Sequence, residues 1–182
     1  MNPWDERRIT EPDPGSPAAL PTRGEVRLRM KTHPATHGLD GAWWPRSRDP
    51  AAEFPDLVLV MSSWVGPVRR VTYAVDDWDA AGQNVAIDGW LVELVGSTTL
   101  QSHTVLVTGT HQRTRSLLVV PPTAPGAAAR AVLMATAGPH AVDSAADMLT
   151  HNGVRLGRSD LHSVDLHSVD LQNADLRSAD GV

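Results

Sequence analysis

Residues 104–120 read TVLVTGTHQRTRSLLVV, two apolar runs separated by a polar loop. Both runs, 104–108 and 116–120, are rich in valine, leucine and threonine, a composition that favours β-strands. The loop between them is much shorter than a parallel crossover requires, so the sequence predicts an antiparallel hairpin. Two prolines follow directly and end the second strand, because proline has no amide hydrogen to give to a sheet.

Five further segments before this hairpin also have the pattern of strands. The first, EVRLRMK, alternates apolar Val26, Leu28 and Met30 with charged residues, as expected for a half-buried strand. Short turns that contain glycine, proline or aspartate separate most of the segments. The predicted strands are 25–31, 39–44, 68–75, 84–88 and 90–95.

Three segments favour helices. Asp49 and Pro50 form a helix start, because aspartate caps the free amides and proline fits the first turn. Pro55 interrupts this pattern, so we expect a short first turn and then a helix from about Pro55 to Trp64. The alanine-rich segment 127–137 has high helix propensity, and 143–150 is a second candidate nearby.

This order of elements predicts an α+β fold. Consecutive strands with short connections must be antiparallel, so we expect a curved antiparallel sheet of six or seven strands. The sheet is expected to be partly barrel-like and to pack against two or three helices. The sequence divides into a flexible, proline-rich arm (1–24), a single domain (25–153) and an acidic tail (154–182).

The tail contains a strict five-residue repeat, SDLHS-VDLHS-VDLQN-ADLRS, over residues 159–178. Five residues match the period of neither a helix face nor a strand face, but they fit a square coil with one repeat on each side. The tail therefore resembles the pentapeptide-repeat family. Four repeats give one coil, and a coil needs neighbours to bury its core. A disordered acidic tail, docking as a cap, or joining a partner's solenoid all remain open.

Composition excludes several classes of protein. The 182 residues include no cysteine, which excludes disulfides, zinc–thiolate sites and thiol catalysis. No apolar run is long enough to span a membrane and no apolar segment marks the start, so we expect a soluble, cytoplasmic protein. Residues 159–182 hold five aspartates against one arginine, and the rest of the chain is nearly neutral. Nothing has the basic excess typical of nucleic-acid binding.

Residues 40–49, DGAWWPRSRD, form an unusual motif. It resembles the signature of an actinobacterial domain-of-unknown-function family, and further matches follow at 66–71, at Trp78 and at 117–123. The resemblance covers about residues 26–150, with a looser fit at 90–96 and 110–114. It implies a cytoplasmic single-domain protein and no assigned activity, cofactor or partner.

The same motif supplies the candidate binding residues. Trp43 and Trp44 are adjacent, so on a strand they point to opposite faces, one into the core. The other, with Arg46 and Arg48, could line a groove for a small anionic or planar ligand, or for a protein partner. The alternative is structural, with the arginines paired to nearby carboxylates. Trp78 completes the candidate set.

An enzyme is the alternative reading. Asp76 and Asp77 lie in a turn beside Trp78, and His103 ends a loop, so these three could form an acid–base site. The aspartates lack the spacing of a calcium loop, and no metal or cofactor site is expected. The sequence has no nucleophile elbow, phosphate loop or dinucleotide fingerprint. A non-catalytic binding or accessory protein is therefore favoured.

Overall fold

The computed structural model describes residues 25–33, 35, 38–87, 89–138 and 144–157. The proline-rich arm and the pentapeptide-like repeats, with the predictions made for them, lie outside these residues. Seven strands and three α-helices are present in the described ranges, with two short 3-10 turns, η1 and η2. Their bounds are β1 (Leu28–Met30), β2 (Gly41–Trp43), α1 (Pro50–Val65), β3 (Val68–Ala74), η1 (Val75–Asp77), β4 (Asn84–Ile87), β5 (Trp90–Ser97), β6 (Thr104–Gly109), η2 (Thr110–Gln112), β7 (Thr114–Val119), α2 (Gly126–Thr136) and α3 (Ala145–His151).

The seven described strands form one sheet in the order β1-β2-β7-β6-β3-β5-β4. The α+β class is confirmed, and each predicted strand is present. The sheet is mixed and open, however, and not wholly antiparallel or barrel-like: β2 pairs with β7, and β3 with β5, in parallel. Both parallel pairs join strands that are not consecutive in the chain. The short connections on which the prediction relied therefore do not constrain them.

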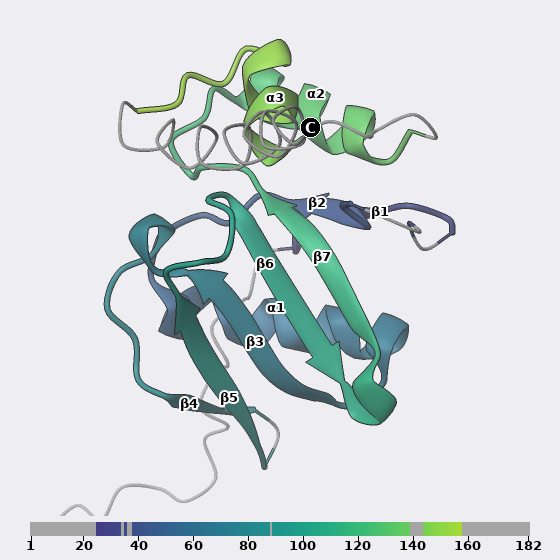
Figure 1. Ribbon diagram of the computed structural model, residues 1–182, viewed down its shortest axis with the longest axis vertical. Coiled ribbons are helices and arrows are strands. Elements are labelled where there is room, and N and C mark those ends of the chain that lie inside the picture. The colour runs from purple at the N-terminus through teal and green to yellow at the C-terminus, as the bar shows by residue number, and fades with distance from the viewer. Residues whose placement is uncertain (1–24, 34, 36–37, 88, 139–143, 158–182) are drawn as a thin grey trace, which may run out of the picture.

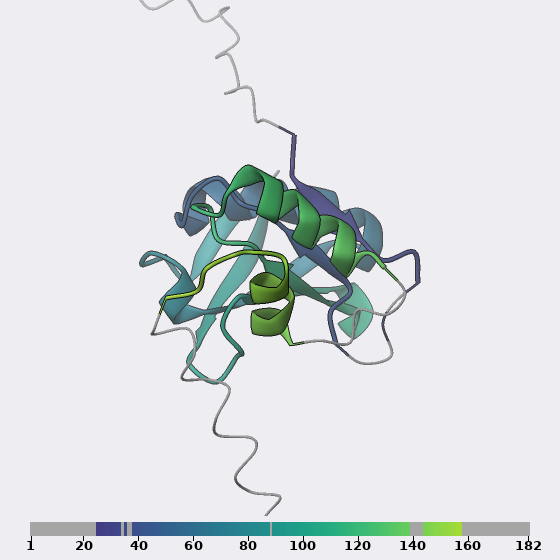
Figure 2. The same ribbon diagram turned by 90° about the horizontal axis from the view of Figure 1, so that it is seen from above.

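Helices cover both faces of the sheet, but at different places. Helix α1 lies behind β3, β6 and β7, whereas α2 and α3 lie together at the end of the sheet that carries β1 and β2 (Figures 1 and 2). The α1 side buries Phe54, Leu57 and Met61 against the sheet, and Leu133 and Leu149 belong to a second cluster on the other side. None of the helices in the described ranges is long and apolar enough to cross a membrane.

Strand β7 belongs to both clusters. Leu117 and Val119 face the α1 side, whereas Leu118 and Val120 pack with α2 and α3. All four side chains are buried. A strand that is covered on both faces has a continuous apolar sequence, which explains why this segment lacks polar residues at alternate positions.

Helix α1 runs from Pro50 to Val65 without a break. The predicted separation at Pro55 is therefore wrong. Pro55 cannot donate to the carbonyl of Ala51, but Ala51 is exposed, so water can satisfy that carbonyl. The predicted start is correct, because the Asp49 carboxylate accepts the amide hydrogen of Ala51 at 2.9 Å.

The 40–49 motif has several structural roles. The buried carboxylate of Asp40 accepts the amide hydrogens of Ala35 and Ser116, at 3.0 and 2.9 Å, and so ties the preceding loop to β7. Gly41 lies against the backbone of β1, where a side chain would clash with the carbonyl oxygen of Arg29. Trp43 is buried in the core at 2% exposure. The structure therefore explains several residues of this motif, Asp40, Gly41 and Trp43, by their roles in the fold.

Candidate functional site

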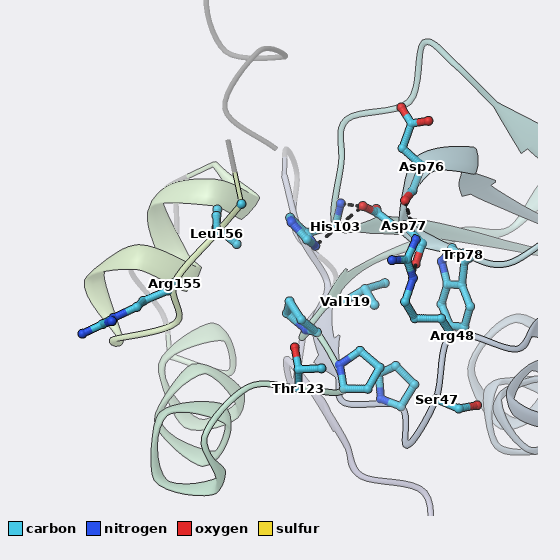
Figure 3. Close-up of a pocket in the computed structure, with 14 residues that line it drawn as sticks. Ser47, Arg48, Asp76, Asp77, Trp78, His103, Val119, Thr123, Arg155 and Leu156 are labelled. Carbon is cyan, nitrogen blue, oxygen red and sulfur yellow. Dashed lines mark hydrogen bonds and ion pairs between the residues drawn. The ribbon is translucent and has the colours of Figure 1, made fainter. Parts of the chain in front are cut away.

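A cavity of about 220 Å³ opens where the loop before α1, the η1 turn and the ends of β6 and β7 meet. The chain after α3 closes its other side (Figure 3). We call this cavity the Arg48–His103 pocket. It is lined by Pro45, Ser47, Arg48, Asp76, Asp77, Trp78, His103, Val119, Pro121, Pro122, Thr123, Arg155, Leu156 and Gly157.

Arg48 joins the loop before α1 to the η1 turn. Its Nε donates to the carbonyl oxygen of Asp77 at 2.9 Å, and its Nη2 donates to that of Asp76 at 2.6 Å. The backbone carbonyl of Arg48 accepts the amide hydrogen of Asp79 at 2.9 Å. These bonds use one edge of the planar guanidinium, the side that carries Nε and Nη2, and hold it in one orientation at the pocket.

Asp77, whose backbone binds Arg48, forms a buried pair with His103 at the pocket. The Asp77 carboxylate accepts the backbone amide hydrogen of His103, and His103 Nδ1 lies 3.8 Å from Asp77 Oδ1. Both side chains are less than a tenth exposed. The φ of His103 is 60°, a left-handed backbone conformation that residues other than glycine rarely adopt. The carboxylate therefore holds the backbone of this loop, and the imidazole lies beside it.

Trp78 forms part of the floor between the pocket and the core. It is 5% exposed and stacks on Trp43, with ring centroids 5.4 Å apart and planes at 20°. Phe54 contacts the same ring at 4.6 Å between centroids. The indole Nε1 is buried, and no residue of the described structure accepts its hydrogen. In Figure 3 the Arg48 side chain runs alongside the Trp78 ring.

The rest of the lining is mostly apolar. Val119, Pro121, Pro122 and Leu156 contribute hydrocarbon surface. The carboxylate of Asp76 points away from the cavity, so this residue presents its backbone to Arg48 and not an acid group to a ligand (Figure 3). The pocket therefore combines hydrogen-bond donors with apolar walls.

A second hollow, of about 620 Å³, lies between β1 and α2. We call it the arginine groove. Its lining residues are Glu25, Val26, Arg27, Leu28, Arg29, Trp44, Arg130, Leu133 and Met134. Three arginines and one glutamate make it electropositive, and Met134 is 66% exposed on its apolar wall.

Arg27 is the most constrained cation in this groove. Its guanidinium lies 3.6 Å from the centroid of the Trp44 ring and donates to the carbonyl oxygens of Trp44 and Pro45 at 3.0 and 2.7 Å. Burial and the neighbouring charge of Arg46 lower the pKa of Arg27, and Glu53 partly offsets them. Positive charge is thus crowded at this end of the groove.

The structure divides the predicted binding residues between these places. Arg48 and Trp78 line the pocket, and Trp43 lies in the core beneath it. Trp44 lines the groove, so the two adjacent tryptophans do face opposite sides. Arg46 lies near that groove, where its guanidinium donates to the Glu25 carbonyl oxygen at 2.9 Å and its backbone amide donates to Glu53. Of the alternative acid–base site, the structure brings the side chains of Asp77 and His103 together, whereas the Asp76 carboxylate points away from them (Figure 3).

Sequence reasoning missed the arginine groove. The alternation of the first strand did place Arg27 and Arg29 among its outward residues, but Arg130 belongs to a helix much later in the chain. Only the packing of α2 beside β1 brings these arginines together. Within the described residues, no group of three or more histidine, aspartate or glutamate side chains is placed to hold a metal ion.

Comparison with known proteins gives one match. A family model covers residues 27–136, more than half of the chain. The chain belongs to DUF5994, a family of unknown function. The region shared with DUF5994 includes Arg48, Trp78 and His103, whereas Arg155–Gly157 and the acidic repeats lie beyond it. No curated protein and no solved structure matches the chain.

Proposed function

We propose that this member of DUF5994 is a non-catalytic binding protein that holds a small carboxylate in the Arg48–His103 pocket. The observation that carries the proposal is the indole N–H of Trp78, which is buried at the pocket and meets no acceptor in the described structure. A buried donor without an acceptor costs about 1–3 kcal/mol. Neighbouring side chains now cover this N–H, so a ligand oxygen that displaced them and accepted its hydrogen would recover that free energy.

Arg48 supports an anionic ligand. Its Nε and Nη2 are bound to backbone carbonyls, but its Nη1 takes no part in those bonds. No carboxylate of the described residues forms an ion pair with it. A guanidinium that is already oriented loses little entropy when it binds an anion, and charge-assisted hydrogen bonds are about twice as strong as neutral ones.

The size and walls of the pocket limit the ligand. About 220 Å³ is below the range of roughly 300–1,000 Å³ that is usual for drug-sized molecules. Val119, Pro121, Pro122 and Leu156 favour a compact hydrocarbon body behind the charged group. Short aliphatic carboxylates satisfy both limits.

Thermal unfolding with matched ligands tests this proposal. The probes are straight-chain carboxylates from acetate to pentanoate and the amides of equal length, at constant ionic strength. A carboxylate at about one hundred times its Kd should stabilise the fold by about 2.7 kcal/mol. The amides, which lack the charge, should bind at least about tenfold more weakly. Equal effects of acids and amides, or no effect of either, would refute the carboxylate assignment.

A pair of arginine variants locates the site. Arg48→Met should weaken binding of the best carboxylate by about tenfold or more, because it removes the oriented cation. Arg113→Met changes an exposed arginine outside the pocket in the same way and should bind like the unaltered protein. Circular dichroism of both variants shows whether the fold is retained. Equal binding by the two variants would exclude Arg48 from the site.

The buried Asp77–His103 pair favours a second candidate, an acid–base enzyme. A histidine held by a carboxylate can activate water, and hydrolysis of a small ester would leave a carboxylate in the same pocket. Release of nitrophenol from p-nitrophenyl acetate tests it: turnover above the uncatalysed rate that is lost in His103→Asn supports the enzyme. No turnover by the unaltered protein favours the binding function. The cytoplasmic location, the actinobacterial origin and the role of residues 40–49 as a family signature remain predictions from the sequence.

A further inference from the structure

We propose that the arginine groove is the docking site for the acidic C-terminal segment of the same chain, residues 159–182. The segment lies outside the described structure. The proposal rests on the charge and shape of the groove, on the composition of the segment, and on where the described chain ends. It is independent of the carboxylate proposed for the Arg48–His103 pocket.

The groove presents concentrated positive charge. Arg27, Arg29 and Arg130 line it, and Glu25 is the one carboxylate among its described lining residues. Arg46 adds a fourth cation close to Arg27. Mutual repulsion of these cations is relieved when an anionic segment lies among them.

The C-terminal segment is the complementary partner within the chain. It holds Asp160, Asp165, Asp170, Asp175 and Asp180 against a single arginine, whereas the rest of the sequence is nearly neutral. A leucine follows each of the first four aspartates. The segment therefore offers charge and apolar side chains together, which is also the combination that the groove presents through its arginines and the exposed wall at Met134.

The route from the end of the described chain is short. Gly157 and Pro45 line the same pocket, and Trp44, the neighbour of Pro45, lines the groove. Five residues of extended chain span about 17 Å, which is about the length of the eleven-residue helix α2. One repeat beyond Gly157 is thus long enough to pass along the groove.

The groove also suits an extended backbone. Its lining includes Leu28 and Arg29, neighbours in β1 whose side chains point to opposite faces, so the groove reaches the edge of this strand. Strand β1 is an end strand of the described sheet. The outer edge of such a strand offers amide and carbonyl groups to a further extended segment, as in β-strand addition.

A spin label tests the docking in the full-length chain. The protein has no cysteine, so Ser178→Cys carries a nitroxide at one defined position. In ¹⁵N-labelled protein, the amide signals of β1 and α2 should lose most of their intensity until the label is reduced. The loss should disappear at about 1 M NaCl, where the Debye length is about 3 Å. Unchanged β1 and α2 signals, or losses confined to other surfaces, would overturn the proposal.

Charge variants and a mixed sample complete the test. Arg130→Glu should abolish the signal loss, whereas Arg113→Glu, outside the groove, should leave it intact. Replacement of the five tail aspartates by asparagine should also abolish it. The mixed sample combines protein that carries the spin label but no ¹⁵N with ¹⁵N-labelled protein that carries no spin label. This sample should show no loss of signal. A loss in that mixture would instead mean that the segment binds a second copy and would overturn docking within one chain.

Discussion

At the scale of single residues, His103 combines an unusual backbone conformation with a place in the pocket lining. Its left-handed φ of 60° carries a free-energy penalty of about 1–2 kcal/mol for a residue other than glycine. The Asp77 carboxylate offsets that penalty, because it accepts the amide hydrogen that this conformation presents. The same carboxylate lies 3.8 Å from the imidazole Nδ1, so the residue that offsets the local strain also lines the pocket.

Two substitutions at His103 separate backbone strain from side-chain chemistry. Asparagine tolerates the left-handed region, whereas valine, with its branched β-carbon, does not. His103→Val should therefore be less stable than His103→Asn by about 1–2 kcal/mol, measured by chemical denaturation. Both variants lose the imidazole, so its chemistry does not contribute to the difference. Equal stability would show that the left-handed conformation is not retained.

Gly109 ends β6 where the chain meets the last turn of α1. A β-carbon at this position would clash with the carbonyl group of Val65. Gly109→Ala should destabilise the fold by about 1–3 kcal/mol in denaturant unfolding. Gly82→Ala is the control, because its nearest neighbour, the Asn84 carbonyl oxygen, lies at 3.8 Å, and its effect should stay within about 0.5 kcal/mol. A similar loss at both sites would contradict the close packing of β6 on α1.

At the scale of elements, the start of α1 depends on one side chain. The Asp49 carboxylate caps the helix through the amide of Ala51. Asp49→Ala should lower the free energy of unfolding by about 1 kcal/mol, whereas Asp49→Asn, an equally good cap, should have little effect. Thermal unfolding followed by circular dichroism compares the two. An equal loss in both would show that the charge of Asp49 matters and its capping bond does not.

The helices and strands could be predicted because each depends on a pattern of residues that are close together in the sequence. Alternation in the first strand, the apolar run before Pro121 and the capping residue Asp49 each depend on near neighbours in the chain. The parallel pairs could not be predicted in the same way, since β2 and β7 are far apart in sequence. The sequence predicts a break at Pro55, because the exposure of Ala51, which makes the missing hydrogen bond tolerable, is a property of the fold.

The candidate site was less predictable than the elements. Arg48, Trp78 and His103 were each singled out from the sequence, but as members of competing hypotheses. Sequence position gave no reason to join them, because the pocket forms where several stretches of the chain, far apart in sequence, meet. The arginine groove was missed for the same reason, since Arg130 approaches Arg27 only through the packing of α2.

At the scale of the whole molecule, the two apolar clusters share strands. Trp43 faces the α1 cluster and Ala42 the cluster with α2 and α3, on the same strand β2. We therefore expect one cooperative unfolding transition. Phe54→Ala and Leu149→Ala, one in each cluster, should each shift the whole transition, with losses of about 2–5 kcal/mol. Near- and far-ultraviolet circular dichroism should give coincident curves, and two separate transitions would contradict this expectation.

The most direct measurement for the central claim is the NMR signal of the Trp78 indole N–H during titration with a short carboxylate. This buried donor has no acceptor among the described residues, and we propose that the ligand supplies one. The account predicts a saturable downfield shift of that signal and slower exchange of its hydrogen with water. The amide of equal length should require about tenfold more ligand. A Trp78 signal that stays unchanged, while the protein remains folded, would contradict the account.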